Sequence, residues 1–455
     1  MNKEIDTRTR LLTEKASKLM LSLSVPGILG MVFVALYNTM DSIFVGQLVG
    51  TTEMGAVSIS YPFTLINGGI ATLIGVGSAS ILSRAIGKKD EKTIGNIMSN
   101  LSMMVIVLSV LVTLIGTLFT RQILQLSGAE GEMLDAAEKY LRIIFCGSIF
   151  INFTQSSNMV MRGQGLLKKA MTIIASGSIL NIILDPIFIT YFNQFGMGLE
   201  GAASATVLSQ ILQCAVSIWF FTKKGGMLKI RKIGFEKDII PEMLLVGVSA
   251  MLMQVMTLVQ QTVIFNVASR YGGDNALVLL GAALRVQNFA FVPLWGMSQG
   301  FQPAVGTNYG AKEYDRVIYI TKVFITGATI LALCFYIPIE LFPDKILSLF
   351  ISNLSIVASG VTNFRIMFST YIALGLFIMV VTLFQALGKA SKASLIVMLR
   401  QIILFIPAVV LFPMINGLGE TGVWLAIAVV DGFVGIMTIV MMLKEFNRIR
   451  ALKVS

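Results

Sequence analysis

Residues 19–45 read LMLSLSVPGILGMVFVALYNTMDSIFV, an apolar run that contains a single carboxylate, Asp41, and a single proline, Pro26. The run is longer than the roughly 20 residues that an α-helix needs to cross a ~30 Å hydrocarbon core. Similar runs recur as far as Leu443, and because a backbone in lipid must satisfy its own hydrogen bonds, each is predicted to be a helix. Twelve spans are expected, at about 19–45, 55–83, 94–119, 136–160, 169–191, 199–221, 240–268, 277–306, 317–340, 357–384, 393–414 and 420–443.

The composition of the whole chain is that of a membrane protein. Of its 455 residues 55% are hydrophobic and only 13% are charged, and the mean hydropathy is +0.82. The charged stretch before the first span leads into a long apolar run without a small-residue cleavage site, so this span is expected to remain in the mature protein. The predicted fold class is an all-α integral membrane protein, multi-pass in the cell membrane.

The net charge of +11 is distributed in a way that indicates membrane topology instead of nucleic-acid binding. With twelve spans and an internal N-terminus, 27 of the 35 Lys and Arg residues fall in cytoplasmic segments. This asymmetry is the positive-inside rule, and it predicts that both termini are cytoplasmic. No nucleic-acid partner is expected; the partners are the lipid bilayer and the cargo, and the chain is expected to be a monomer.

The chain contains an internal repeat. When it is compared with itself in one constant register, Gly77–Ile94 falls on Gly300–Val317 and Gly165 falls on Gly388; after a small deletion in the second half, Pro186 falls on Pro407 and Gly201 on Gly422. Six spans per half make the repeat parallel, with a pseudo-two-fold axis along the membrane normal, an arrangement typical of halves that rock about a central site. The predicted domains are an N-terminal six-helix lobe (1–222), a cytoplasmic linker (223–237) and a C-terminal six-helix lobe (238–455).

Acidic residues within the spans are the leading functional candidates, because a charge in the bilayer is costly. Asp41 and Asp185 lie at similar depths in the first and fifth spans, Tyr37 and Asn181 precede them by one helical turn, and Thr206 reaches the same depth. Two neighbouring carboxylates in a low dielectric cannot both ionise cheaply, so the pair is a natural H⁺ carrier. The oxygens of Asp41, Asp185, Asn181 and Thr206 are equally suited to Na⁺, and a purely structural role as helix cap or interhelical contact is the alternative.

Other polar residues give weaker signals. Asp431 falls on Gln210 in the repeat, and it either pairs with an intramembrane arginine (Arg285, Arg365 or Arg400) or forms a secondary polar site with Gln254 and Gln260. Pro26 removes a backbone donor, so the first span is expected to bend there, as a gating hinge or as a passive kink. The chain has no His and no GxxxxGK[ST] loop, so an enzyme is not expected and the energy source is expected to be an ion gradient.

Together these features resemble the multidrug and toxic compound extrusion (MATE) family along essentially the whole chain. The resemblance depends on the doubled twelve-span plan, the stretch PGILGMVFVALYNTMDSIFVGQL, the loops GKKDEKT and GAKEYDR, MRGQG, and NIILDPIFI followed by GLEGAASATVLSQ. It is closest to the DinF-like, MepA-like bacterial branch. In that branch the acids equivalent to Asp41 and Asp185 form the cation site of the N-terminal lobe, and Tyr37, Asn181 and Thr206 occupy matching positions.

The resemblance implies secondary active efflux of cationic or amphipathic drugs or metabolites in exchange for H⁺ or Na⁺, without a cofactor. Another bacterial branch carries acids on its seventh and tenth spans, where this chain has Gln254, Thr257, Gln260 and Gln385. Coupling is therefore expected in the N-terminal lobe alone. A flippase or exporter of a lipid-linked glycan or other endogenous amphiphile is the alternative function.

Overall fold

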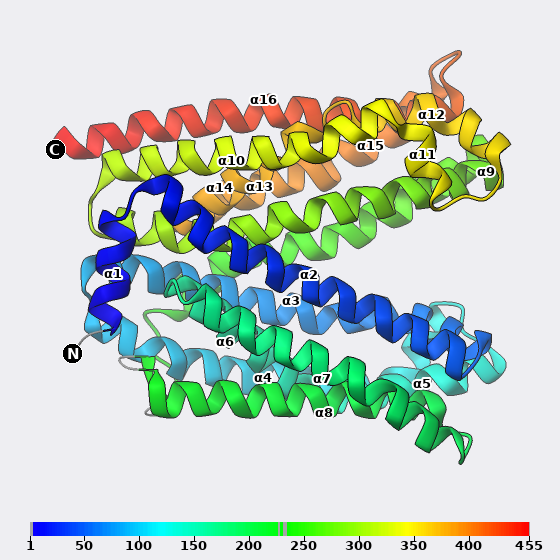
Figure 1. Cartoon of the computed structure of the whole chain (residues 1–455), viewed down its shortest axis with the longest axis horizontal. Helices are drawn as coiled ribbons and strands as arrows, with labels where there is room; N and C mark the ends of the chain where they lie inside the picture. Colours follow the sequence, from blue (N-terminus) through cyan, green and yellow to red (C-terminus); the bar gives the residue numbers. More distant parts are fainter. Residues whose placement is uncertain (1–2, 226–227, 231–233, 455) are drawn as a thin grey trace. The chain divides into compact units, whose positions relative to one another are not determined.

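The computed structural model describes residues 3–225, 228–230 and 234–454, and these residues are helical almost throughout (Figure 1). The first half contains α1 (Lys3–Thr13), α2 (Ala16–Leu48), α3 (Thr51–Lys88), α4 (Glu91–Leu126), α5 (Gly131–Cys146), α6 (Ser148–Gly163), α7 (Leu167–Asn193), α8 (Gly198–Trp219) and the π-helical segment Phe220–Lys224. The second half contains α9 (Ile240–Gly310), α10 (Tyr314–Leu341), α11 (Pro343–Ser348), α12 (Leu354–Phe368), α13 (Tyr371–Ala386), α14 (Ala390–Met398), the π-helical segment Leu399–Ile403, α15 (Phe405–Leu411), a 3₁₀ turn (Phe412–Met414) and α16 (Gly419–Val454). The predicted all-α fold class is confirmed.

The twelve predicted spans correspond to ten helices, among the described residues, that are long and apolar enough to cross a membrane. One difference arises because α9 runs through both the seventh and the eighth span. Gly273 within it has φ 61° and ψ −154°, which is not helical, so the segment consists of two helices joined at a kink. The other arises because the fourth span is divided at Gly147 into α5 and α6, which have 16 residues each. Every predicted span therefore has a helical counterpart.

The backbone repeats where the sequence repeats. Left-handed residues occur in pairs that the repeat superimposes: Lys89 and Lys312, Gly165 and Gly388, Gly196 and Gly417. The fourth span is broken at Gly147, and the tenth is broken between α12 and α13, at Thr370, the residue on which Gly147 falls in the register of the repeat. The similarity of the two halves is thus present in turn geometry as well as in residue type.

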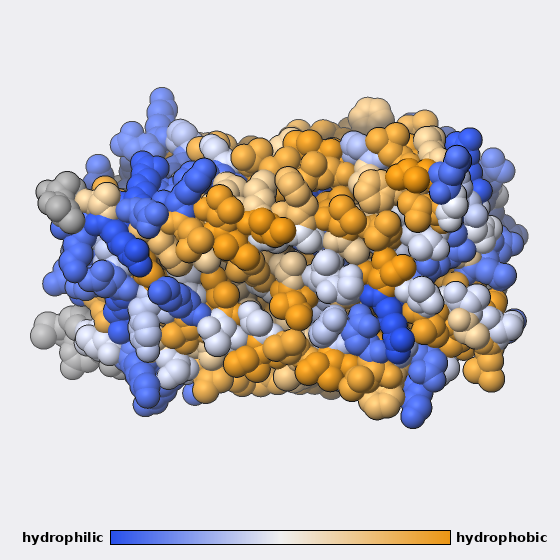
Figure 2. Space-filling view, turned by 90° about the horizontal axis from the view of Figure 1, so that it is seen from above, coloured by the Kyte–Doolittle hydropathy of each residue, from blue (hydrophilic) through white to orange (hydrophobic). Residues whose placement is uncertain are grey.

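One side of α4 is an exposed stripe of apolar side chains. Its outward stripe includes Leu111, Leu114 and Leu118, which are exposed, while Leu101 and Val105 are buried against the rest of the unit. An exposed apolar stripe along a helix is expected where the surrounding solvent is lipid. Figure 2 shows such apolar surface across the middle of one face, with hydrophilic residues gathered toward both ends of the helices.

The chain divides into two compact units whose limits differ from the predicted lobes at the first helix of each half. Unit 1 holds the chain up to Arg8 together with Leu29–Met251, and unit 2 holds Thr9–Ile28 together with Leu252–Ser455. The start of α2 therefore belongs to unit 2, and the start of α9 belongs to unit 1. Part of the predicted linker, at 226–227 and 231–233, lies outside the described residues.

Small residues explain why the helix starts are distributed in this way. In unit 1, a Cβ at Gly77 would lie 2.0 Å from the Met243 carbonyl oxygen, and one at Gly247 would lie 1.8 Å from that of Leu73. In unit 2, the backbone of α2 likewise closely approaches Gly296 and Gly300. These glycines let two helix backbones come into contact, an interaction that depends on distant parts of the chain and is not visible in local sequence.

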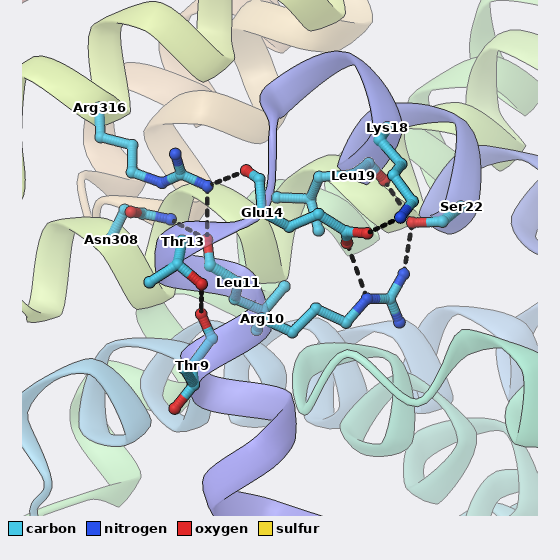
Figure 3. Close-up of polar contacts among 10 residues, drawn as sticks. All are labelled: Thr9, Arg10, Leu11, Thr13, Glu14, Lys18, Leu19, Ser22, Asn308 and Arg316. Atoms are coloured by element: carbon cyan, nitrogen blue, oxygen red, sulfur yellow. Dashed lines mark hydrogen bonds and ion pairs between the residues drawn. The ribbon is translucent and has the colours of Figure 1, made fainter.

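The turn between α1 and α2 is held in unit 2 by the polar cluster in Figure 3. Asn308 donates to the Leu11 carbonyl at 3.0 Å, and Arg316 donates to the carbonyl of Glu14. The Glu14 side chain pairs with Arg10 at 2.8 Å and with Lys18 at 3.5 Å. Burial raises the pKa of Glu14, but the two cations outweigh burial and hold that pKa below its ordinary value. The cluster fixes the direction in which α2 begins.

Candidate functional site

The centre of the candidate site is the carboxylate of Asp185 on α7, which is 0% exposed. Asn181, one turn earlier on the same helix, donates from Nδ2 to Asp185 Oδ1 at 3.0 Å. The same amide nitrogen lies 3.4 Å from the hydroxyl oxygen of Thr206 on α8. The extensive packing of α7 against α8 brings these three side chains together, as their similar depths in the sequence predicted.

Helix α2 contributes Tyr37 and Asp41 to the same place in unit 1. The hydroxyls of Tyr37 and Thr206 hydrogen-bond to each other, and the charge of Asp41 acts on Asp185. Tyr37 and Asp41 are partly buried, whereas Asp185, Asn181 and Thr206 are buried. All five residues that the sequence singled out therefore lie together, although their role in cation coupling remains a prediction.

Sequence reasoning missed Tyr140 on α5. This residue is buried and lies close to Asp41, Tyr37 and Asp185. Depth along the predicted spans gave only a weak signal, because Tyr140 lies four residues from the start of the fourth span at 136 and Thr206 lies seven from the start of the sixth at 199.

Two acceptor atoms give the site its chemical character. Asn181 Oδ1 and Asp185 Oδ2 are buried and have no hydrogen-bond donor among the residues that the structure describes. A buried unpaired acceptor costs about 1–3 kcal/mol, more when it is charged, so such atoms favour binding a cation. Together with the hydroxyl of Thr206 and the carboxylate of Asp41, they form an oxygen set that suits a proton or Na⁺.

Pro26 lies inside α2 and is buried in unit 2, before the point where the helix passes into unit 1. Because proline has no N–H, the carbonyl of Ser22 loses its normal helical donor. The hydroxyl of Ser22 meanwhile accepts a hydrogen bond from Arg10 and donates one to the Leu19 carbonyl. The predicted hinge thus lies next to the polar cluster that anchors the start of α2.

In unit 2, Asp431 on α16 forms a bidentate ion pair with Arg400. Arg400 Nε lies 2.8 Å from Oδ1 and Nη2 lies 3.2 Å from Oδ2, and the guanidinium also covers the Phe377 ring at 4.9 Å. Of the three arginines considered from sequence, Arg400 is the partner. A paired, hydrogen-bonded carboxylate of this kind fits the structural alternative.

Gln254 and Gln260 both lie partly buried on α9, and each belongs to the secondary polar site proposed from sequence. Gln401, which follows Arg400 in the π-helical segment, makes two hydrogen bonds to α9 in this region. Gln401 Nε2 donates to the Met253 carbonyl at 3.1 Å and to the Thr257 hydroxyl at 3.0 Å. Sequence reasoning missed Gln401 because a π-helical segment changes which side chains share a helix face.

Comparison with known proteins agrees with this architecture. A family model described as MatE matches residues 26–187 and 249–438. The multidrug export protein MepA of Staphylococcus saprophyticus subsp. saprophyticus is 27% identical over 439 residues, covering 95% of each chain. The FAD transporter of Shewanella oneidensis is 23% identical, covering 94% of this chain and 95% of its own. A crystal structure of a MATE in the bent conformation superimposes with a TM-score of 0.92 at 25% identity, covering 98% of this chain and 99% of that one.

Proposed function

The chain belongs to the MatE family, as its sequence predicted, and from this membership we propose that it exports cationic and amphipathic organic compounds in exchange for H⁺ or Na⁺ by alternating access. It is a multi-pass membrane transporter and not an enzyme, and relatives of nearly full length are multidrug exporters. What we propose beyond family membership is the antiport mechanism, the coupling ion and the class of cargo.

The observation that carries this proposal is the unbalanced carboxylate of Asp185. It is fully buried in unit 1, one oxygen has no donor among the described residues, and the nearby charge that acts on it is the second acid, Asp41. A low-dielectric site where two acids lie close together favours whatever neutralises one negative charge. Binding a cation there is therefore the expected way to change the stability of one conformation relative to another.

Export follows if cation and cargo disfavour one another. Reciprocal coupling requires that the cation lowers the affinity for the drug by the same factor as the drug lowers the affinity for the cation. In the plasma membrane, with both termini cytoplasmic, entry of a cation from outside would promote release of cargo to the outside. The proposed working unit is a monomer, and all five residues of the proposed cation site come from unit 1 of a single chain.

The test is efflux from proteoliposomes with ΔpH and Na⁺ gradients imposed separately and a fluorescent cationic dye as cargo. Asp41→Asn and Asp185→Asn are expected to reduce gradient-driven efflux at least tenfold, because each removes a charge that the cation would neutralise. Dye binding should be retained, and Asp135→Asn, an exposed acid on α5, should match the unaltered protein. Undiminished efflux in both site variants would refute the proposal.

A second candidate function is the export of an endogenous anionic amphiphile, which is suggested by the similarity to the FAD transporter. Such a cargo would require available cationic side chains, and the buried Arg400 is already bound by Asp431. The multidrug proposal is therefore preferred. Saturable transport of flavin nucleotides, together with no transport of cationic dyes, would reverse this preference.

A further inference from the structure

Helix α6 has an unusually polar face for a helix in a membrane. Six of its hydroxyl and amide side chains are at most 2% exposed: Ser148, Asn152, Thr154, Ser156, Ser157 and Asn158. They are buried within unit 1, where α6 packs against α3, α4 and α8; Figure 1 shows the position of α6 in the chain. Arg162 follows near the end of the helix, so polar groups extend along most of its length, or ~21 Å at ~1.5 Å per residue.

Many of these side chains have polar atoms without a protein partner. Within the described residues the unpaired atoms include Ser148 Oγ, Asn152 Oδ1, Thr154 Oγ1, Asn158 Oδ1 and Arg162 Nε. Buried polar groups in native proteins are nearly always paired, and where protein partners are missing the partner is usually ordered water. In a bilayer each unpaired group would be especially costly, so a run of them along one helix indicates a row of water-binding positions.

The repeat provides an internal comparison that separates this feature from ordinary packing. In the register that places Gly165 on Gly388, the six buried polar residues of α6 fall on residues of α13 that are mostly apolar, namely Tyr371, Gly375, Phe377, Met379, Val380 and Val381. The two helices have the same place in their halves and the same break before them. The polar face is therefore not required by the fold, and it occurs in the unit that contains Asp41 and Asp185.

Helix α8 extends the polar row to the acid site. Thr206, Ser209, Gln213 and Ser217 recur at helical spacing and share one face; Ser217 Oγ is another buried unpaired atom among the described residues. Thr154 on α6 lies near Cys214 on α8, where the two helices pack together, so the two faces meet. In the register that places Gly201 on Gly422, three of the four positions are again apolar in α16, where Ile427, Val430 and Val434 replace Thr206, Ser209 and Gln213.

We propose that unit 1 contains a buried chain of ordered water between α6 and α8, which leads from the Asp41–Asp185 site to the Arg162 end of α6 and carries the coupling proton to the cytoplasm. This inference rests on the function proposed above and selects H⁺ as the coupling ion. Hydroxyl and amide groups separated by about one helical turn can each hold a water molecule that passes a proton to the next. Na⁺, which needs a shell of several oxygens at each step, is less suited to so narrow a row.

Hydration can be measured without transport, by X-ray radiolytic footprinting of the full chain in lipid nanodiscs. Met161 on α6 and Met379 on α13 are a matched pair, because both thioethers are 0% exposed. Oxidation of Met161 is expected to be at least fivefold faster than that of Met379. Cys214 should also be labelled, and Thr154→Val, which removes a hydroxyl at nearly constant volume, should reduce its labelling. Equal protection of both methionines would overturn the proposal.

Transport then tests whether the water carries the proton. Ser148→Ala and Thr154→Val are expected to slow ΔpH-driven efflux at least fivefold, with an unchanged KM for the dye and a larger solvent isotope effect. If these hydroxyls were only unpaired core groups, their removal would leave the rate unchanged and raise stability slightly. The control is Thr382→Val on α13, a buried hydroxyl that donates to a carbonyl of its own helix.

The outcomes distinguish this inference from the function on which it rests. If Asp41→Asn and Asp185→Asn abolish efflux while Ser148→Ala and Thr154→Val leave both labelling and rate unchanged, the water chain is wrong and the antiport proposal stands. If the two acid variants transport normally, both fail. Thermal denaturation of each variant identifies misfolded protein, and Ser148→Ala is small enough to keep the test usable if another variant is unstable.

Discussion

Asp185 and Asp431 are both carboxylates buried in apolar helices, yet their neighbours give them different chemistry. Asp431 is 4% exposed at its side chain and receives two hydrogen bonds from one guanidinium, so its negative charge is balanced. Asp185 receives one hydrogen bond from a neutral amide and has a second oxygen without a donor among the described residues. The first arrangement balances its charge within the protein, whereas the second is the arrangement proposed above to bind a cation.

Breaking the Asp431–Arg400 pair should therefore destabilise the fold and affect coupling only indirectly. Asp431→Asn is expected to lower stability by about 3–5 kcal/mol, because it leaves a guanidinium that is only 12% exposed without its counter-ion. The measurement is the thermal denaturation midpoint of the purified protein. In the double variant with Arg400→Gln the two effects should be strongly non-additive, and simple additivity would contradict a direct pair.

At the level of single elements, the start of α4 shows how a loop residue fixes a helix. The carboxylate of Asp90 accepts hydrogen bonds from the Thr93 hydroxyl at 2.7 Å and the Thr93 N–H at 3.0 Å. These two bonds hold the pKa of Asp90 below its ordinary value of 3.8. Such an N-cap supplies a partner for one of the orphan N–H groups in the first helical turn.

The stability that Asp90 gives to α4 should depend on pH in a predictable direction. Because its native pKa is lower than that of the unfolded chain, the charged cap stabilises fully above the ordinary pKa and is lost as the pH falls through the native value. Asp90→Ala should cost about 1 kcal/mol at neutral pH. The measurement is hydrogen exchange in the first turn of α4, corrected for intrinsic rates. Asp90→Asn is the matched control and should retain the cap while losing the pH dependence.

The sequence predicted the helical elements well and their interruptions less well. Span length located every membrane helix, because it follows from the thickness of the bilayer, whereas the cytoplasmic placement of both termini stays a prediction. The break at Gly147 and the π-helical segment Leu399–Ile403 depend on packing against other helices, so local patterns did not reveal them. Comparing how deep each residue lies in its predicted span correctly grouped the residues around Asp185. The same comparison did not identify Tyr140, and it did not decide which arginine pairs with Asp431.

At the scale of the whole molecule, close contacts between helix backbones involve the first helix of each half. A Cβ at Gly247 would lie 1.8 Å from the Leu73 carbonyl oxygen, so Gly247→Ala forces two backbones apart. We expect a marked fall in the denaturation midpoint and reduced transport. Gly281→Ala is the control, since no described heavy atom beyond its own helix lies within 4 Å of a Cβ there. In that helix interior alanine should be neutral or stabilising by about 0.5–1 kcal/mol. Equal midpoints for the two variants would contradict the contact.

The passage of α2 from one unit to the other between Ile28 and Leu29 gives this helix a mechanical property. Asn308 and Arg316 hold the turn that precedes this helix, whereas Tyr37 and Asp41 lie on its later turns, after Pro26. A change of helix direction at Pro26 would move the later turns of α2 while its first turns stay in place. Under the proposed coupling, a change of charge at Asp41 would act on the same continuous backbone that contains Pro26 and begins in the other unit.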